Sequence, residues 1–315
     1  MFDQKKLEKI LIVTKDIKDI KIQGATNIAK EAFKIIKSET ENQSFSSKEE
    51  LEKFLRESSE LLINARETEP MLFNGMKYAR FSFQKNKEKS LEELKKIIID
   101  SFDFFLNLIK QEKIQRAEIG SELVKDWMTI FTHCHSSSVV ELLLKAKEKE
   151  KKFIVYNSET RPLFQGRKTS AELVSWGIDT TMVADWAWAY LINNSVEKHV
   201  NINMIFLGAD AIKLNGDVMN KVGSFAIGLS AFHSHIPVYI VGSLAKIDTV
   251  DTVDIEMRDS KEIRPEAPAW LKIANYAFDT IPAEFITGII TEFGVIKPSD
   301  LKKTLEEKYP RMTDK

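Results

Sequence analysis

Residues 126–157 read DWMTIFTHCHSSSVVELLLKAKEKEKKFIVYN, and this stretch decides the fold. Two short apolar runs, at 127–133 and 152–157, flank a segment with the three- and four-residue periodicity of a helix. A strand that is buried on both faces is apolar throughout, and a helix between two such strands is typical of the crossover in a parallel sheet. The stretch therefore predicts a strand–helix–strand unit.

Three more apolar runs continue the pattern: TTMVAD at 180–185, NMIFLGAD at 203–210 and PVYIVG at 237–242. Helical patterns lie between these runs, SAELVSWG at 170–177 and MNKVGSFAIGLSAFHS at 219–234. Regular alternation of buried strands with helices predicts a Rossmann-like, doubly wound parallel sheet. We assign this α/β domain to residues 126–315.

Residues 1–125 have a different texture, with apolar positions at helical spacing inside long charged stretches. The segments 47–66 and 90–115 show it most clearly, and each begins on a serine that acidic residues follow. Serine in that position caps a helix by accepting a hydrogen bond from a backbone N–H of the first turn. We therefore predict an N-terminal helical domain, with Ser47 and Ser90 as N-caps.

The composition is that of a globular protein, since 43% of the 315 residues are apolar and 46 basic side chains nearly balance 47 acidic ones. A net charge of −1 argues against nucleic-acid binding through a global basic field. The apolar runs are too short to span a bilayer, and the first residues lack the apolar core of a signal peptide. We therefore expect a cytoplasmic protein whose partners include neither nucleic acid nor a membrane.

Cys134 is the only cysteine, which excludes a disulfide within the chain and a zinc site of several thiolates. Neither GxGxxG nor GxxxxGK[ST] occurs, so no nucleotide fingerprint is present. The five histidines include two pairs at i, i+2, but no third metal ligand is evident beside them. We therefore predict neither a metal nor a cofactor.

The polar residues that follow the predicted strands are the candidates for chemistry, because ligands of doubly wound sheets bind beyond the carboxyl ends of the strands. They are His133, Cys134, His135, Ser136 and Ser137 after the first strand, Glu159, Thr160 and Arg161 after the second, Asp185 after the third, and Gly208 and Asp210 after the fourth.

Cys134 lies between a strand and a helix start that we predict at 136–138. Backbone N–H groups and the helix dipole favour a thiolate or a bound phosphate there, and His133 and His135 are placed to bias the ionisation of the thiol. A buried structural cysteine is the alternative. The residues alone leave both interpretations open.

Asp210 directly follows the apolar run MIFLGA, so its carboxylate is partly desolvated, as suits general acid–base chemistry. The local alternative is a helix N-cap for the segment near Val218, or a residue of the turn at 215–217.

Two further segments suit an anionic ligand. LNGDVMNKVG (214–223) combines a tight turn with Asn220 and Lys221 at a predicted helix start. In SETRPLFQGRK (158–168), Arg161 and Arg167 can clamp a phosphate, with surface salt bridges as the alternative, and Gln165 and Gly166 allow close approach of the backbone.

The motifs THCHSSS (132–138), SETRPLFQG (158–166), GADAIKLNGDVMNKVG (208–223), VDIEMRD (253–259) and NYAFDTIPAEFITGIITEFGVIKP (275–298) stand in one characteristic order. In these motifs the chain resembles a superfamily that contains ribose-1,5-bisphosphate isomerase, methylthioribose-1-phosphate isomerase and the alpha, beta and delta subunits of translation initiation factor 2B. The chain is most similar to the archaeal ribose-1,5-bisphosphate isomerase in its short length and in the motifs HCHS and IEMRD. In the motif NGDVMNK it is more similar to the methylthioribose enzyme.

The resemblance implies roles for particular residues. Cys134 and Asp210 match the catalytic pair of the isomerases, and the substrate-binding positions are matched by Gly24, Arg66, Arg161, Asn220 and Lys221.

Two motifs depart from the family pattern. Gln23 replaces the arginine of an Arg-Gly-Ala motif, which removes a charge-assisted contact to phosphate worth about 1.5–3 kcal/mol. The Arg-Pro-Thr sequence usual after the Arg66 position reads Glu67, Thr68 and Glu69, which adds negative charge near the phosphate-binding edge.

The resemblance thus implies an aldose–ketose isomerase of nucleotide salvage that converts ribose 1,5-bisphosphate to ribulose 1,5-bisphosphate without a cofactor. The alternatives are a non-catalytic regulatory subunit like those of initiation factor 2B, or an isomerase for methylthioribose 1-phosphate or deoxyribose 1-phosphate. Assembly into a homodimer or homohexamer through the α/β domain is also implied.

Overall fold

The computed structural model describes residues 4–22, 24–66, 69–193, 200–249 and 255–309. The chain divides into two compact units, which we name the helical unit (residues 1–111 and 306–315) and the sheet unit (residues 112–305). Helix α5 (Leu91–Ser121) contributes to both, because its residues from Glu112 onward belong to the sheet unit. The division into domains at residue 125 stays a prediction.

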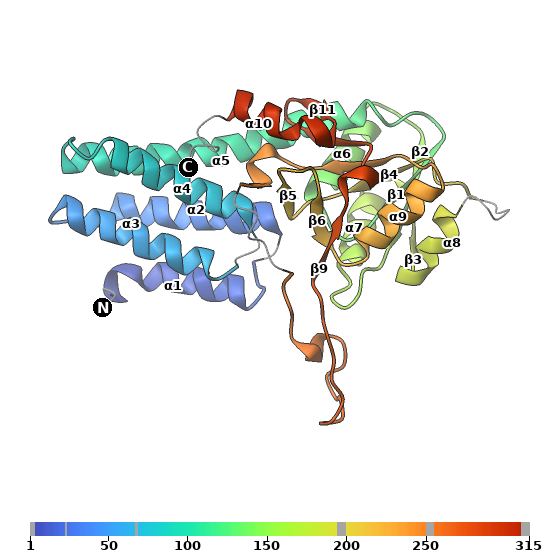
Figure 1. The fold of residues 1–315 in the computed structure, drawn as a ribbon, viewed down its shortest axis with the longest axis horizontal. Coiled ribbons are helices and arrows are strands. Elements are labelled where there is room, and N and C mark those ends of the chain that lie inside the picture. Colours follow the sequence, from blue (N-terminus) through green and yellow to red (C-terminus); the bar gives the residue numbers. More distant parts are fainter. Residues whose placement is uncertain (1–3, 23, 67–68, 194–199, 250–254, 310–315) are drawn as a thin grey trace. The chain divides into compact units, whose positions relative to one another are not determined.

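The helical unit is built from amphipathic helices that precede α5 (Figure 1). They are α1 (Gln4–Lys18), α2 (Ala25–Asn42), α3 (Lys48–Ile63) and α4 (Pro70–Lys85). Their apolar faces meet in a core where the rings of Phe33 and Phe102 stack with centroids 5.6 Å apart. Within the described ranges, no helix combines the length and the hydropathy that a membrane span requires.

The sheet unit is organised around a seven-stranded sheet in the order β11-β10-β7-β4-β1-β2-β3, as far as the described residues define it. The strands are β1 (Met128–Thr132), β2 (Phe153–Ser158), β3 (Asp179–Val183), β4 (Met204–Leu207), β7 (Val238–Val241), β10 (Gly288–Thr291) and β11 (Gly294–Ile296). All neighbours pair in parallel except β10 and β11. The five strands that the sequence predicts are confirmed as β1, β2, β3, β4 and β7.

The strand order reverses between β1 and β4. From β1 the chain adds β2 and β3 on one side, and then returns to add β4, β7 and β10 on the other. The connecting helices are α6 (Ser137–Glu148), α7 (Gln165–Ser175), α8 (Trp188–Ile192) and α9 (Ser224–His233), with α6 packed beside α7 and α8 beside α9. The carboxyl ends of β1 and β4 therefore form the crevice where ligands of such sheets bind.

A second, four-stranded sheet was not predicted. It has the order β8-β5-β6-β9 and is formed by β5 (Ala211–Lys213), β6 (Val218–Lys221), β8 (Ile247–Asp248) and β9 (Phe278–Ile281). The prediction of a helix over 219–234 is wrong in its first part, because β6 ends at Lys221 and α9 begins only at Ser224. The predicted burial of every strand on both faces fails for β3, an edge strand that is largely exposed.

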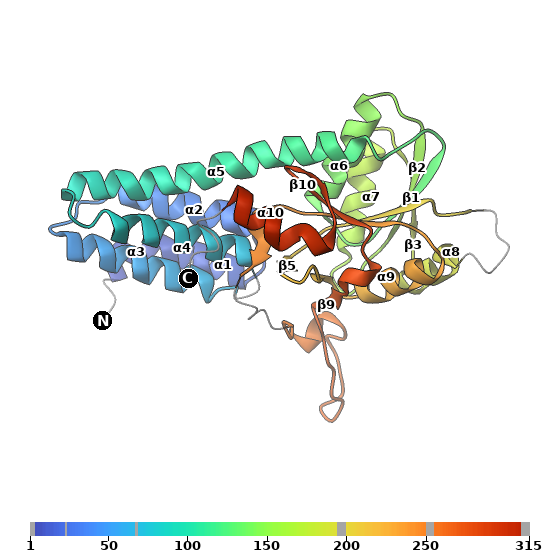
Figure 2. The ribbon, with the colours of Figure 1, turned by 45° about the horizontal axis from the view of Figure 1, so that its top comes forward.

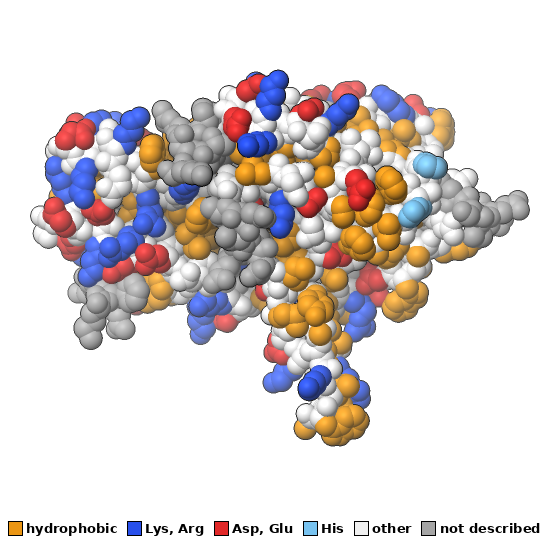
Figure 3. All heavy atoms as spheres, in the orientation of Figure 1, with side chains coloured by type: hydrophobic (Ala, Val, Ile, Leu, Met, Phe, Trp, Pro, Cys, Tyr) orange, Lys and Arg blue, Asp and Glu red, His pale blue; other side chains and the backbone are white. Residues whose placement is uncertain are grey.

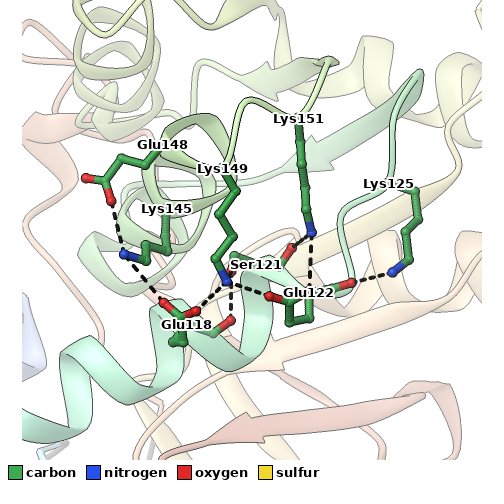
Figure 4. Close-up of polar contacts among 8 residues, drawn as sticks. All are labelled: Glu118, Ser121, Glu122, Lys125, Lys145, Glu148, Lys149 and Lys151. Atoms are coloured by element: carbon green, nitrogen blue, oxygen red, sulfur yellow. Dashed lines mark hydrogen bonds and ion pairs between the residues drawn. The ribbon is translucent and has the colours of Figure 1, made fainter.

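The last turns of α5 are joined to the segment between α6 and β2 by a network of lysines and glutamates (Figure 4). Lys149 Nζ lies 2.5 Å from a carboxylate oxygen of Glu118 and of Glu122, and it donates to Ser121 Oγ at 2.9 Å. Lys151 Nζ donates to the Ser121 carbonyl at 2.6 Å. Exposed pairs of this kind contribute up to about 1 kcal/mol each, so the network mainly fixes the position of α5.

Residues 255–277 form an arm that projects from the rest of the sheet unit in both ribbon views (Figure 1 and Figure 2). Met257 and Tyr276 pair across the arm, and Arg258 N donates to the Asn275 carbonyl at 2.9 Å. Hydrophobic side chains gather at its tip (Figure 3), where Trp270 is 82% exposed. The base of the arm, unlike the tip, contributes to the site described below.

Both predicted N-caps are present and allow a stability test. Ser47 Oγ accepts from Glu50 N at 3.2 Å, and Ser90 Oγ accepts from Glu93 N at 3.4 Å. We expect Ser47→Ala to lower the free energy of unfolding by about 1 kcal/mol, measured by urea unfolding followed through helix circular dichroism. Ser44→Ala, at an exposed position outside the helices, is the control; equal losses in both variants would contradict the capping role.

Candidate active site

Cys134 directly follows β1, and its backbone is held from two sides. Its φ of 66° is left-handed, its N–H donates to Thr160 Oγ1 at 2.9 Å, and its carbonyl accepts from Thr169 Oγ1 at 2.9 Å. The side chain is buried and points its Sγ at Gln165 Oε1, 3.4 Å away. A thiol hydrogen bond to an amide oxygen requires the protonated sulfur, so this geometry fits a neutral cysteine.

Burial raises the pKa of the Cys134 thiol to about 11; the charge of Lys221 lowers this pKa and that of Asp210 raises it. Of the two interpretations left open by the sequence, the neutral, buried cysteine fits this environment, because loss of solvent outweighs the favourable charge of Lys221. His133 and His135 supply no positive charge near neutral pH, since burial lowers both of their pKa values to about 4.

Asp210 lies between β4 and β5, where its N–H donates to the Met219 carbonyl of β6 at 3.0 Å. This bond places the carboxylate next to the strand that carries Asn220 and Lys221. The alternative of a helix N-cap near Val218 is wrong, because Val218 begins β6. The predicted helix start at Asn220 and Lys221 is wrong for the same reason.

Lys221 is 9% exposed, and its Nζ lies 4.7 Å from the ring centroid of Phe278. Among the described residues, no carboxylate lies within ion-pair distance of this ammonium. A buried cation that lacks an adjacent counter-ion is costly, so an anionic ligand is the partner that would stabilise it. Asn220, the preceding residue, is fixed by its amide, which donates to Ser224 Oγ at 2.9 Å.

Asp185 holds the loop after β2. Its two carboxylate oxygens accept from Thr160 N and Arg161 N, both at 2.7 Å. The guanidinium of Arg161 lies 5.2 Å from the Phe164 ring centroid. The loop thereby forms one wall of a small pocket, whose polar lining residues include Arg161, Gln165, Lys221, Arg258 and Asn275.

Arg167 does not belong to this pocket. It pairs with Glu159 at 3.0 Å and lies over the Phe164 ring at 3.8 Å, so the surface-pair alternative describes it. At Gly166 the close approach is that of the chain's own backbone, since a Cβ there would meet the Ser158 carbonyl oxygen at 1.8 Å.

Three residues at the site were not among the predicted site residues. Gln165 holds the thiol, and Lys246 donates from a buried Nζ to the Ala209 carbonyl at 2.7 Å. Arg258, at the base of the arm, is buried by a bidentate contact with Glu262 at 2.5 and 3.0 Å. Gln165 and Arg258 lie in the quoted motifs, whereas Lys246 lies in none of them and the sequence gives no signal for it.

Gly24 and Arg66 belong to the helical unit. Gly24 precedes α2 with a φ of 83°, a conformation that glycine adopts without strain. Arg66 follows α3, and its Nε lies 3.5 Å from a carboxylate oxygen of Glu69, which is 2% exposed. Gln23, Glu67 and Thr68 lie outside the described residues.

The sheet unit thus gathers five predicted residues at one edge: Cys134, Arg161, Asp210, Asn220 and Lys221. Their roles, and those of Gly24 and Arg66, stay predictions. In the described part of the chain, no cluster of three His, Cys, Asp or Glu side chains is arranged to hold a metal ion.

The action of Lys221 on Cys134 can be measured directly. Lys221→Met removes a charge that lowers the thiol pKa, so less thiolate is present at any pH below that pKa. We expect the rate of alkylation at about pH 8 to fall by roughly tenfold, because the thiolate fraction falls in proportion as the acid dissociation constant falls. Lys168→Met is the control, because Lys168 acts on His135 instead. Unchanged or faster alkylation in Lys221→Met would contradict this geometry.

Comparison with known proteins agrees with the fold and the motifs. The sequence profile of the initiation factor 2 subunit family matches residues 21–298. The chain is 32% identical over 299 residues to ribose 1,5-bisphosphate isomerase of Archaeoglobus fulgidus, covering 93% of this chain and 91% of that one. It is 34% identical over 269 residues to methylthioribose-1-phosphate isomerase of Thermoanaerobacter sp., covering 78% and 74%.

A solved structure shows the same fold. Translation initiation factor eIF-2B of Pyrococcus horikoshii OT3 superposes with a TM-score of 0.79 at 25% identity, over 92% of this chain and 98% of that chain. Together with the profile match over most of the sequence, this likeness settles the family. The chain belongs to the initiation factor 2 subunit family.

Proposed function

We propose that this protein is a sugar-phosphate isomerase that converts ribose 1,5-bisphosphate to ribulose 1,5-bisphosphate with Cys134 and Asp210. The observation that supports it most is the convergence at one sheet edge of a buried thiol, a carboxylate and a buried ammonium, since the charges of Asp210 and Lys221 both act on Cys134. The similarity to named isomerases supports the same reaction class.

The reaction needs two proton transfers and one hydrogen shift. An acid protonates the ring oxygen as its bond to C1 breaks, and a base takes the proton of the C2 hydroxyl as the C2 carbonyl forms. One hydrogen moves from C2 to C1, so no oxidant, reductant or cofactor is consumed. Cys134 and Asp210 carry the two proton transfers in a site that excludes most water.

Lys221 and Arg161 supply the positive charge that a phosphate requires. Lys221 is buried beside the thiol, so it also stabilises any thiolate that forms during turnover. Asn220, with its amide fixed by Ser224, is placed to contact sugar hydroxyls. Gln165 orients the thiol hydrogen.

NMR of the purified protein with ribose 1,5-bisphosphate tests this proposal. We expect conversion to the ketose, and we expect Cys134→Ser and Asp210→Asn each to lower kcat by about 10²–10⁴-fold, while Ser175→Ala on the exposed side of α7 retains wild-type activity. Conversion that survives in Cys134→Ser would contradict the mechanism. Absence of turnover with this sugar and with methylthioribose 1-phosphate would contradict the isomerase and favour a regulatory subunit.

A monophosphate is the second candidate substrate, and the contact between Arg66 and Glu69 favours it. If Arg66 binds phosphate, as the resemblance implies, Glu69 competes for its guanidinium, because the carboxylate lies 3.5 Å from Nε. Gln23 in place of the arginine of the family's Arg-Gly-Ala motif acts in the same direction. Methylthioribose 1-phosphate or a deoxyribose 1-phosphate needs fewer such cationic contacts than a bisphosphate does.

Glu69→Gln tests whether Glu69 restricts phosphate binding. Removing the competing carboxylate should lower KM for a phosphorylated substrate by about three- to tenfold. A charge-assisted contact to phosphate is worth about 1.5–3 kcal/mol, and the gain is smaller because the amide introduced by Glu69→Gln can still contact the guanidinium of Arg66. Steady-state kinetics with both sugars measures the change, with Glu60→Gln on the exposed face of α3 as control. An unchanged KM with either sugar would show that Glu69 does not restrict phosphate binding.

The similarity also supports a homo-oligomer, as a homodimer or homohexamer, and the single free cysteine suits the cytosol. We place the proposed reaction there, in nucleotide salvage.

A further inference from the structure

A buried pair of carboxyl groups joins α5 to the ends of two sheet strands. The side chains of Glu112, on α5, and Glu292, after β10, are each 1% exposed. One guanidinium nitrogen of Arg116 bridges them, at 3.2 Å from Glu112 Oε2 and 3.4 Å from Glu292 Oε2. The Glu112 carboxyl lies within hydrogen-bond reach of the Glu292 carboxyl, and a hydrogen bond between two carboxyl groups requires a proton on one of them.

That proton balances the charges of Glu112, Arg116 and Glu292. Arg116 neutralises one carboxylate, and a second buried carboxylate adds a negative charge that is costly in the protein interior. Burial and the neighbouring Glu112 raise the pKa of Glu292 well above its ordinary value, and Arg116 only partly opposes them. The charged groups that face Glu292 are those of Glu112 and Arg116, both on α5. On the other side, the backbone N–H of Leu244 donates to Glu292 Oε1 at 3.3 Å.

The cluster continues to the active site through the short helix η2 (Leu244–Lys246) after β7. Ser243 Oγ donates to Glu112 Oε2 at 2.6 Å and accepts from Ala245 N at 3.0 Å. The next residue is Lys246, whose Nζ donates to the carbonyl of Ala209, the residue before Asp210. A displacement of η2 would therefore move the contact that holds the Asp210 loop.

We propose that Glu112 and Glu292 share one proton and that this shared proton is a positioning device, which fixes η2 and thereby the loop that presents Asp210. Its effect on catalysis rests on the proposed function, whereas its effect on structure does not. The native protein binds this proton at pH values where the unfolded chain has released it, so stability falls as the pH rises between the two pKa values.

Carboxamide variants test the shared proton without substrate. Glu292→Gln mimics the protonated form, because its amide can donate to Glu112 and accept from Leu244 N. We expect the urea midpoint of the wild type to fall as the pH rises from about 5 to about 8, and that of Glu292→Gln or Glu112→Gln to stay level over this range. The double variant should be much less stable than either single one, because Arg116 then has no counter-charge.

Glu148→Gln, at an exposed pair on α6, should keep the wild-type pH dependence. A wild-type midpoint that does not fall, a fall that persists in Glu292→Gln, or a double variant as stable as the single ones would overturn the shared proton.

Hydrogen exchange of the peptide 208–213 tests the positioning. At about pH 9 we expect this peptide to exchange several-fold faster in the wild type than in Glu292→Gln, with equal rates at about pH 6, since the two proteins differ only once the proton is lost. Equal rates at both pH values would overturn it. Where turnover is measurable, kcat should fall over the same alkaline range in the wild type and not in Glu292→Gln. Absence of turnover contradicts the proposed function, and the urea midpoints and the exchange rates then still test the shared proton.

Discussion

The parallel pairing of β1 with β4 is the constraint on which the rest of the site depends. Ile130, Phe131 and Thr132 lie opposite Met204, Ile205 and Phe206, so both strands end at the same edge. Because the strand order reverses at this pair, no helix crosses over the gap between their ends. The loops that follow, with Cys134 after one strand and Asp210 after the other, therefore meet although they are far apart in the sequence. The second sheet then adds Lys221 through the bond between Asp210 N and the Met219 carbonyl.

Burial then sets the chemistry of these groups. It raises the pKa of Cys134 and lowers the pKa values of His133 and His135, so all three are neutral near pH 7. The hydrogen bonds of His133 fit a neutral ring, since Nδ1 is bonded to Ser158 Oγ and Nε2 to the Val222 carbonyl. The buried side chain of Lys221 acts on that thiol and lowers the thiol pKa. Such a site favours reversible proton transfer on an anionic sugar over nucleophilic attack by a thiolate.

The sequence is most informative where one physical rule acts alone. Continuous apolar runs identify β1, β2, β4 and β7, because strands buried between two helix layers are apolar on both faces. The sequence also predicts β3 from its apolar residues, although β3 is an exposed edge strand. β10 leads directly into the antiparallel strand β11 and not into a helix, so the strand–helix alternation does not predict it. β6 fits the pattern of a helix because Val218, Met219 and Val222 suit either periodicity. The sequence therefore indicates the chemistry of Lys221 but not its structural element.

Interactions between distant residues carry no local signal. Arg116 and Glu292 lie at opposite ends of the sheet unit's sequence, and nothing near either residue indicates the other. The sequence shows that Glu69 stands near Arg66 in place of a neutral residue, so a contact between the two can be predicted. The burial of Glu69 cannot be predicted from the sequence. The sequence alone also leaves the ionisation of Cys134 open, because the local pattern does not show how deeply the thiol is buried. A helix start favours a thiolate, and the depth of burial that overrides it is a property of the folded chain.

The ionisation of the single cysteine tests the account most directly, because every thiol signal from this chain comes from Cys134. Titration of the native protein, followed by the thiolate absorbance, should show a pKa near the value of about 11 that burial produces. A native-state pKa at or below neutral pH would contradict the account, since Cys134 would then be a preformed thiolate nucleophile and no longer a proton donor held by Gln165.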